Sequence, residues 1–206
     1  MPNWCFTNYA IYGDEKPLRS LYNKMKRLEK RKESLLPNGF GKNWLGNLVK
    51  RLGGNPGIVS CRGDWTNLKF DHEDGFPVLH LDTQTAWSRC KVVEQLILSW
   101  CKDKYGDTPS IFFISEELGN GIFETNDKKG DVFPEQVIVD DEQNGIEYFT
   151  EKAAIEYLAA KALDEGYATP ILTWKDAVDF AELRNDTADE EETETHIWLH
   201  KAELAA

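Results

Sequence analysis

Two histidines near the end of the chain have the spacing of metal ligands. His196 and His200 lie four residues apart, so both would share one face of a helix or of a strand. A zinc site needs a third protein ligand, and Glu194 and Glu203 are the nearby candidates in an acidic tail. The stretch lacks the catalytic glutamate of the H-E-x-x-H motif. We therefore expect no metal and no cofactor at these histidines.

Pro2 is the other candidate for covalent chemistry. If Met1 were removed, a terminal secondary amine with a pKa lowered by burial could form a Schiff base with a carbonyl substrate. The simpler expectation is that Pro2 leads directly into the first strand. Adjacent acids such as Glu116 and Glu117 would point to opposite faces of a strand, so we interpret them as surface groups. No phosphate-loop or nucleophile-elbow motif occurs, and a non-catalytic role is favoured.

Charge is distributed unevenly along the chain. Residues 1–62 hold 12 Lys/Arg and 4 Asp/Glu, a balance of +8, whereas residues 63–206 hold 12 and 32, a balance of −20. The net charge of −12 opposes general binding to phosphate backbones. The basic segment is a local exception, with a basic helix over 16–32. Its candidate phosphate contacts, with those of the next helix, are Lys24, Arg27, Arg31, Lys50 and Arg51.

The elements that must position these residues follow from periodicity. Residues 4–12 alternate with apolar groups on both faces, which indicates a strand in the middle of a sheet. Helical spacing follows over 17–28 and, as an inserted short helix, over about 43–53. Strands over 58–70 and 76–83 flank a turn at 72–75, a helix that Ser88 could cap runs over 88–104, and a short apolar strand covers 111–114. The order β-α-β-β-α-β predicts an α+β, ferredoxin-like core over 1–118, an antiparallel sheet with helices on one face.

Residues 119–206 are expected to form a C-terminal α+β elaboration packed on that core. Residues 121–125 and 132–139 flank a turn and predict a hairpin. Thr150 can cap a helix that ends at Gly166, and 174–183 predict a second helix. An acidic run over 186–194 should be solvated, and 195–199 return as a strand or short helix.

The remaining composition indicates a soluble protein. The four cysteines, Cys5, Cys61, Cys90 and Cys101, form no C-x-x-C pair and are expected to be free, buried thiols. No apolar run approaches the roughly 18 residues of a membrane span, and no signal peptide follows Met1. We expect a cytoplasmic protein with no membrane partner.

Three stretches carry a family resemblance: the start of the chain from Pro2-Asn3-Trp4-Cys5, the segment 63–71 and the turn Thr85-Ala86-Trp87-Ser88. They resemble a family of bacterial proteins carried on plasmids, phages and pathogenicity islands, the Api/YubB-type proteins; Arg89-Cys90 stands where that family usually has a proline pair. The resemblance covers residues 1 to about 125 and implies a ferredoxin-like domain and a mobile-element setting, with no established activity. We expect its motif residues to be structural, with Trp4, Trp65 and Trp87 buried near one another or at element junctions. These residues are Asn3, Trp4, Asn8, Trp65, Lys69, Thr85, Ala86, Trp87 and Ser88.

Three functions remain in view. The first is a non-catalytic protein-interaction module of a mobile element, which binds a protein partner. The second is nucleic-acid binding through the basic helix over 16–32. The third is an acidic surface that imitates DNA and inhibits a nucleic-acid enzyme.

Overall fold

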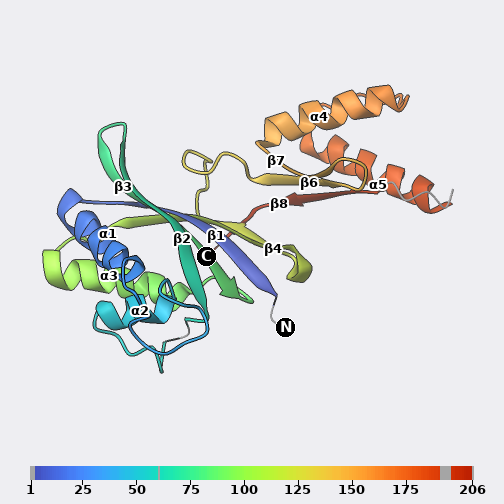
Figure 1. Cartoon of the computed structure of the whole chain (residues 1–206). Coiled ribbons are helices and arrows are strands. Elements are labelled where there is room, and N and C mark those ends of the chain that lie inside the picture. Colours follow the sequence, from blue (N-terminus) through green and yellow to red (C-terminus); the bar gives the residue numbers. More distant parts are fainter. Residues whose placement is uncertain (1–2, 60, 191–195, 206) are drawn as a thin grey trace. The chain divides into compact units, whose positions relative to one another are not determined.

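The structure is a computed structural model that describes residues 3–59, 61–190 and 196–205. The chain has a mixed α+β architecture and divides into two compact units, Met1–Asn126 and Asp127–Ala206, which are described one at a time (Figure 1). Among the described residues, no helix is both long enough and apolar enough to cross a membrane. Pro2 lies outside the described residues.

Unit 1 is built on an antiparallel sheet with the strand order β2-β3-β1-β4-β5. β1 (Trp4–Tyr12) lies between β3 (Phe76–Ala86) and β4 (Ser110–Glu117), and β2 (Gly63–Glu73) pairs with the other edge of β3. The prediction that the first strand is central is confirmed. Its pleat directs Cys5, Thr7, Tyr9 and Ile11 into the core.

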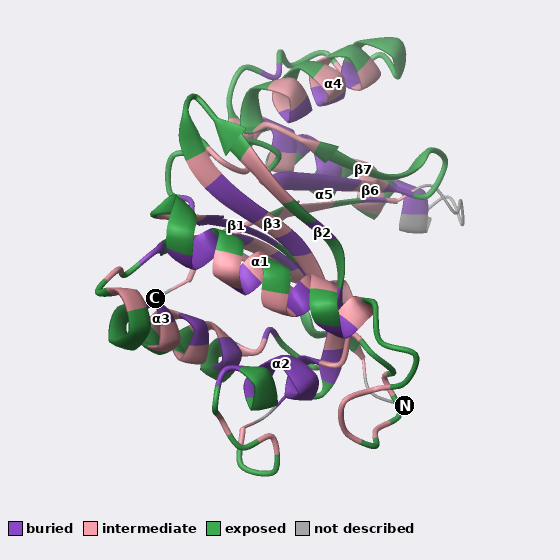
Figure 2. Cartoon of the chain, turned by 60° about the vertical axis from the view of Figure 1, so that its left-hand side comes forward, coloured by how far each residue is buried: buried purple, intermediate pink, exposed green. Residues whose placement is uncertain are grey.

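Three helices cover that buried face of the sheet. They are α1 (Glu15–Glu29), α2 (Leu45–Arg51) and α3 (Lys91–Tyr105), which lie on the same side of the sheet and each contain buried residues (Figure 2). In α1 the buried set recurs at three- and four-residue steps, as the sequence predicts: Pro17, Leu18, Leu21, Met25 and Leu28. The opposite side of α1 is thereby left to its polar and basic residues.

The start of α3 differs from the prediction. The helix begins at Lys91 with Cys90 at its N-cap position, and no side chain caps it. Ser88 is exposed, and its carbonyl oxygen accepts a hydrogen bond of 2.8 Å from the Thr85 hydroxyl. This turn after β3 keeps residues 87–90 out of the helix.

The β2–β3 hairpin is present, but its first strand starts later than expected. Residues 55–58 form a turn in which the Ile58 amide donates to the Asn55 carbonyl oxygen, and β2 begins at Gly63. Asp74 (φ 50°) and Gly75 (φ 84°) make the tight turn, because both central positions of this turn type need positive φ. A bulge between Thr66 and Lys69 shifts the register of the pair.

The predicted hairpin of 121–125 with 132–139 is wrong. β5 (Ile122–Thr125) pairs with β4, from Ile114 opposite Thr125 to Glu117 opposite Ile122. A single turn of 3₁₀-helix, η1 (Leu118–Asn120), and Gly121 (φ 68°) reverse the chain between them. Because β5 joins the first sheet, unit 1 ends at Asn126 rather than at residue 118.

Unit 2 has a three-stranded antiparallel sheet in the order β7-β6-β8 and two helices. Val137, Leu158, Phe180 and Ile197 are among its buried core. Its elements are β6 (Val137–Asp141), β7 (Gly145–Phe149), α4 (Glu151–Asp164), α5 (Trp174–Glu190), β8 (Ile197–Lys201) and β9 (Glu203–Leu204). The Thr150 hydroxyl accepts from the Ala153 amide at 3.2 Å, so the predicted cap of α4 is confirmed.

The acidic run near the end of unit 2 is partly helical. α5 continues to Glu190, seven residues beyond the predicted end at Leu183. The reason is that Ala188 extends the buried stripe of Ala177, Phe180 and Ala181 by two turns. Residues 191–195 lie outside the described part of the chain. Of the stretch predicted as strand or helix over 195–199, residues 197–199 belong to strand β8 (Ile197–Lys201).

Candidate nucleic-acid interface

A basic hollow lies on the solvent side of unit 1, between α1 and the end of α3. It has a volume of about 390 Å³. Among the described residues that line it, none carries a carboxylate. We call it the basic groove, and its lining residues are Lys16, Arg19, Ser20, Asn23, Lys24, Arg27, Lys104 and Tyr105.

The periodicity of α1 explains why these residues converge. Lys16, Ser20, Lys24 and Arg27 recur at steps of three and four residues, on a face beside the buried stripe of the same helix. The C-terminal turn of α3 supplies Lys104 and Tyr105, and the Tyr105 hydroxyl donates a 2.8 Å hydrogen bond to Ser20. The groove therefore has cations on two walls that a hydrogen bond connects.

The positive field of the groove acts on Lys24. Partial burial lowers the pKa of its ammonium group, and the cations of Arg51, Lys104 and Arg27 lower that pKa further. Nearby positive charges disfavour the charged form of Lys24, so an anion that enters the groove stabilises that charged form. A site that crowds cations is suited to phosphate groups, and of its lining cations Arg19 is already paired with the Glu15 carboxylate at 2.6 Å.

Two aromatic rings hold the lysines of the groove. The Lys24 and Lys104 Nζ atoms lie 5.5 and 5.6 Å from the centroid of the Trp100 ring. Lys104 Nζ is also 5.5 Å from the centroid of Tyr105, and Lys16 Nζ is 6.0 Å from it. These are cation–π distances.

Of the five predicted phosphate contacts, two line the basic groove. Lys24 and Arg27 belong to it, and Arg51 is near enough to lower the pKa of Lys24. Lys50 is exposed in the last turn of α2. Arg31 lies beyond the end of α1, where its Nε donates to the Glu33 carbonyl oxygen at 3.2 Å.

Sequence reasoning missed three cations of the groove, Lys16, Arg19 and Lys104. Lys16 precedes Lys24 by eight residues and Arg19 precedes Arg27 by eight residues, so extending the helical spacing of these two cations toward the start of the helix would have found them. Lys104 had no such signal, because only the packing of α3 beside α1 brings it there.

The motif residues of β1 lie partly on the open face of the sheet, which α1, α2 and α3 leave uncovered. The prediction that Trp4 is buried is wrong: it is 36% exposed, beside Phe6 at 50%, and its ring meets Phe40 edge-on with centroids 6.2 Å apart. The Asn8 side chain donates to Asp82 across to β3 at 2.7 Å. Trp4 and Phe6 point away from the helices because they alternate with the buried Cys5 and Thr7.

The turn after β3 contains the second motif tryptophan that is exposed, Trp87. The prediction that Trp87 is buried is also wrong, since it is 49% exposed. Its backbone has φ 73°, and its amide donates to the Asn3 carbonyl oxygen at 2.9 Å. Ala86 lies directly opposite Trp4 in the β1–β3 pair, so both exposed tryptophans belong to one junction of the sheet.

The two motif residues of β2, Trp65 and Lys69, differ in burial. Trp65 is fully buried, as predicted, and its indole nitrogen donates to Glu29 of α1 at 3.2 Å. Lys69 is exposed and forms an ion pair with Asp71 two residues along the strand. Trp65 therefore anchors α1 to the sheet, whereas Lys69 is a surface group.

A buried polar network lies inside unit 1, where sequence analysis noted only a departure from a family pattern. The Arg89 guanidinium donates to Glu94 at 2.6 Å and to Glu124 at 2.8 Å, and it lies 3.7 Å from the centroid of the Phe113 ring. The Tyr9 hydroxyl donates to Glu94 at 2.7 Å. Each charge of this network is thus paired, which is the condition for its burial.

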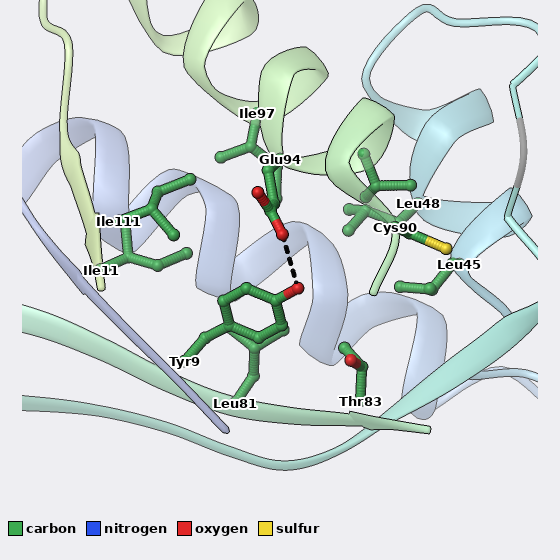
Figure 3. Close-up of a pocket in the computed structure, with 11 residues that line it drawn as sticks. Tyr9, Ile11, Leu45, Leu48, Leu81, Thr83, Cys90, Glu94, Ile97 and Ile111 are labelled. Carbon is green, nitrogen blue, oxygen red and sulfur yellow. Dashed lines mark hydrogen bonds between the residues drawn. The ribbon is translucent and has the colours of Figure 1, made fainter. Parts of the chain in front are cut away.

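A small cavity adjoins this network. Its volume is about 20 Å³, and Thr83 points into it from the sheet (Figure 3). Within the described part of the chain, the Thr83 hydroxyl is buried and has no hydrogen-bond partner. Because about 10–15 Å³ is enough for one water molecule, the cavity suits a single water rather than a substrate.

The thiols of this region are poorly suited to nucleophilic work. Burial raises the pKa of Cys90 to about 12 and, less strongly, the pKa of Cys5. A thiol that stays protonated is a weak nucleophile. All four cysteines are free, and all but the partly buried Cys90 are buried, close to the prediction.

The two histidines of unit 2 do not converge with a third ligand. His196 Nδ1 lies 3.3 Å from Glu142, and its ring stacks on Trp198 with centroids 5.4 Å apart. His200 lies within β8 opposite Ile138. Among the described residues, no group of three or more His, Cys, Asp or Glu side chains could hold a metal ion. Glu194 lies outside the described residues.

Among the described residues, the basic groove is a hollow whose lining charges suit an anion. No protein-family model, no curated protein and no solved structure matches this chain.

Proposed function

We propose that this protein is a non-catalytic binding module whose basic groove holds the phosphate backbone of nucleic acid. The observation that carries the proposal is the convergence of Lys24, Arg27 and Lys104 on one hollow without a carboxylate among its described lining residues. Phosphate contacts supply the sequence-independent part of nucleic-acid affinity. The net charge of −12 confines this binding to the groove, because other surfaces repel the same ligand.

A binding assay with charge-matched variants tests the proposal. We expect a labelled oligonucleotide to bind at about 50 mM salt, and the double variant Lys24→Ala/Arg27→Ala to weaken binding at least about tenfold. The control is Lys91→Ala/Lys152→Ala, which removes the same charge from exposed sites outside the groove. The proposal fails if the oligonucleotide does not bind, or if both double variants weaken binding equally.

A second candidate function is protein binding at the open face of the sheet in unit 1. The observation that favours it is the exposure of Trp4, Phe6 and Trp87 at one junction. Large aromatic side chains are typical anchors of protein interfaces. In a pull-down from bacterial lysate at low salt, wild-type protein should retain a stoichiometric partner that Phe6→Ser loses. Equal retention by both proteins would argue against this surface.

We also propose that unit 1 is a ferredoxin-like core and that the chain is related to the mobile-element family it resembles, with a cytoplasmic location. Support for the fold comes from the element order, β-α-β-β-α-β with α2 inserted, and from the sheet order β2-β3-β1-β4 with antiparallel neighbours. An experimental structure with a parallel, doubly wound sheet would refute the fold.

A further inference from the structure

The basic groove has one aromatic ring in its lining, Tyr105, and a second beside it, Trp100, which two of its lysines contact. Trp100 and Tyr105 lie edge to face with centroids 5.5 Å apart, and Lys24 and Lys104 stand over Trp100. Both rings are only partly buried. The same few side chains can therefore meet a phosphate and the flat face of a base.

This combination distinguishes single strands from duplexes. Proteins that bind single-stranded nucleic acid join a positive groove to rings on which bases stack. In a duplex, the bases are already stacked on one another and are not available to stack on a protein ring. The contact of an exposed lysine with a ring is weaker than the stacking of a base on it, so a base can displace Lys24 or Lys104 toward the phosphates.

The length of the positive surface also favours a single strand over a duplex. From Lys16 to Arg27 the groove runs about 17 Å along α1, at about 1.5 Å per residue. Unit 1 as a whole holds 17 Lys/Arg and 15 Asp/Glu, so outside the five cations of the groove it has 12 basic and 15 acidic residues, a balance of −3. A stiff duplex would extend past the strip, whereas a single strand can follow the groove and bend away.

We infer that the ligand of the basic groove is single-stranded nucleic acid, with its backbone on the cations of α1 and Lys104 and a base stacked on Trp100 or Tyr105. This inference rests on the proposed function and narrows it to one class of nucleic acid.

Fluorescence anisotropy tests the inference with two probes of about 12 nucleotides, an oligothymidylate and its duplex with oligoadenylate. At about 50 mM salt we expect the single strand to bind at least about tenfold more tightly than the duplex. Trp100→Ala should weaken single-strand binding about tenfold and duplex binding by a smaller factor, because the duplex loses only the ring that holds Lys24 and Lys104. Trp100→Phe, which keeps a ring and preserves packing if the alanine variant does not fold, should restore most of the affinity.

The outcomes separate this inference from the function on which it rests. Equal affinity for both probes, or full single-strand binding by a folded Trp100→Ala protein, would overturn the inference while phosphate binding by the groove stood. If neither probe bound wild-type protein, the proposed function would fall as well. Quenching of tryptophan fluorescence by oligothymidylate, reduced in Trp100→Phe, would support stacking at this ring.

Discussion

The salt dependence of binding is the sharpest test of the basic groove, because the number of cations in the groove predicts how steeply affinity falls with salt. Five cations line the groove: Lys16, Arg19, Lys24, Arg27 and Lys104. If each neutralises one phosphate of a single strand, the slope of log affinity against log salt should be about −3.5, at about −0.7 per phosphate. Affinity should then fall about 100-fold between about 50 and 200 mM salt.

The perturbation is Lys104→Ala, which removes one cation from the α3 wall. The slope should become about −2.8, so the variant binds more weakly at low salt and approaches wild type as salt rises. Lys91→Ala is the matched control, since Lys91 lies at the other end of the same helix, about 20 Å away at about 1.5 Å per residue. Its slope should remain that of wild type.

Anisotropy titrations at four salt concentrations give the slopes directly. The reasoning is refuted if Lys104→Ala leaves the slope unchanged, or if Lys91→Ala changes it by the same amount. A wild-type slope near zero would show that phosphate contacts do not supply the affinity. Circular dichroism of each variant confirms that the comparison concerns folded proteins.

Three further predictions concern stability. Thr83→Val should leave the free energy of unfolding unchanged or raise it by up to about 1 kcal/mol, because the buried hydroxyl has no partner among the described residues; a loss above about 1 kcal/mol in urea unfolding would show that it is bonded. Gly63→Ala should destabilise by about 2 kcal/mol or more, since its Cβ would lie 2.2 Å from a backbone oxygen; Gly39→Ala, with nothing within 4 Å, is its control, and equal melting temperatures would contradict the clash. Burial would raise the pKa of Asp141, but Lys161 and neighbouring donors lower it below its ordinary 3.8. Its stabilisation is therefore present above that value and lost as the pH falls through the lowered one, and Asp141→Asn should flatten the acid side of the stability curve; an unchanged curve would argue against the pair.

Sequence periodicity was sufficient to predict a helix or strand wherever its spacing of buried residues depends on that element alone. The alternation in 4–12 and the three- and four-residue steps from Pro17 to Leu28 predict β1 and α1, because a buried stripe needs that spacing whatever lies opposite. Turn chemistry at Asp74-Gly75 likewise predicts the β2–β3 hairpin. The element order followed from these segments.

Pairing between segments was the part that pattern did not decide. Residues 121–125 have the same strand character whether they pair with 132–139 or with β4, and only the tight turn at Gly121 and the free edge of β4 select the second. The exposure of Trp4 and Trp87 likewise depends on tertiary packing, which the local sequence pattern does not decide. A strand with apolar groups on both faces predicts a central position, but which face the helices cover is a property of the folded sheet.

For the candidate site, the sequence by itself determined that α1 carries a basic face with Lys24 and Arg27. Only the tertiary structure placed Lys104 in the groove and Trp100 against Lys24, and only it turned Arg89 into the centre of a buried network with Glu94 and Glu124. The physical reason is distance along the chain. Periodicity reports which side of one helix is solvated, whereas a groove needs two helices that are separated by about 75 residues in sequence and joined by packing on one sheet.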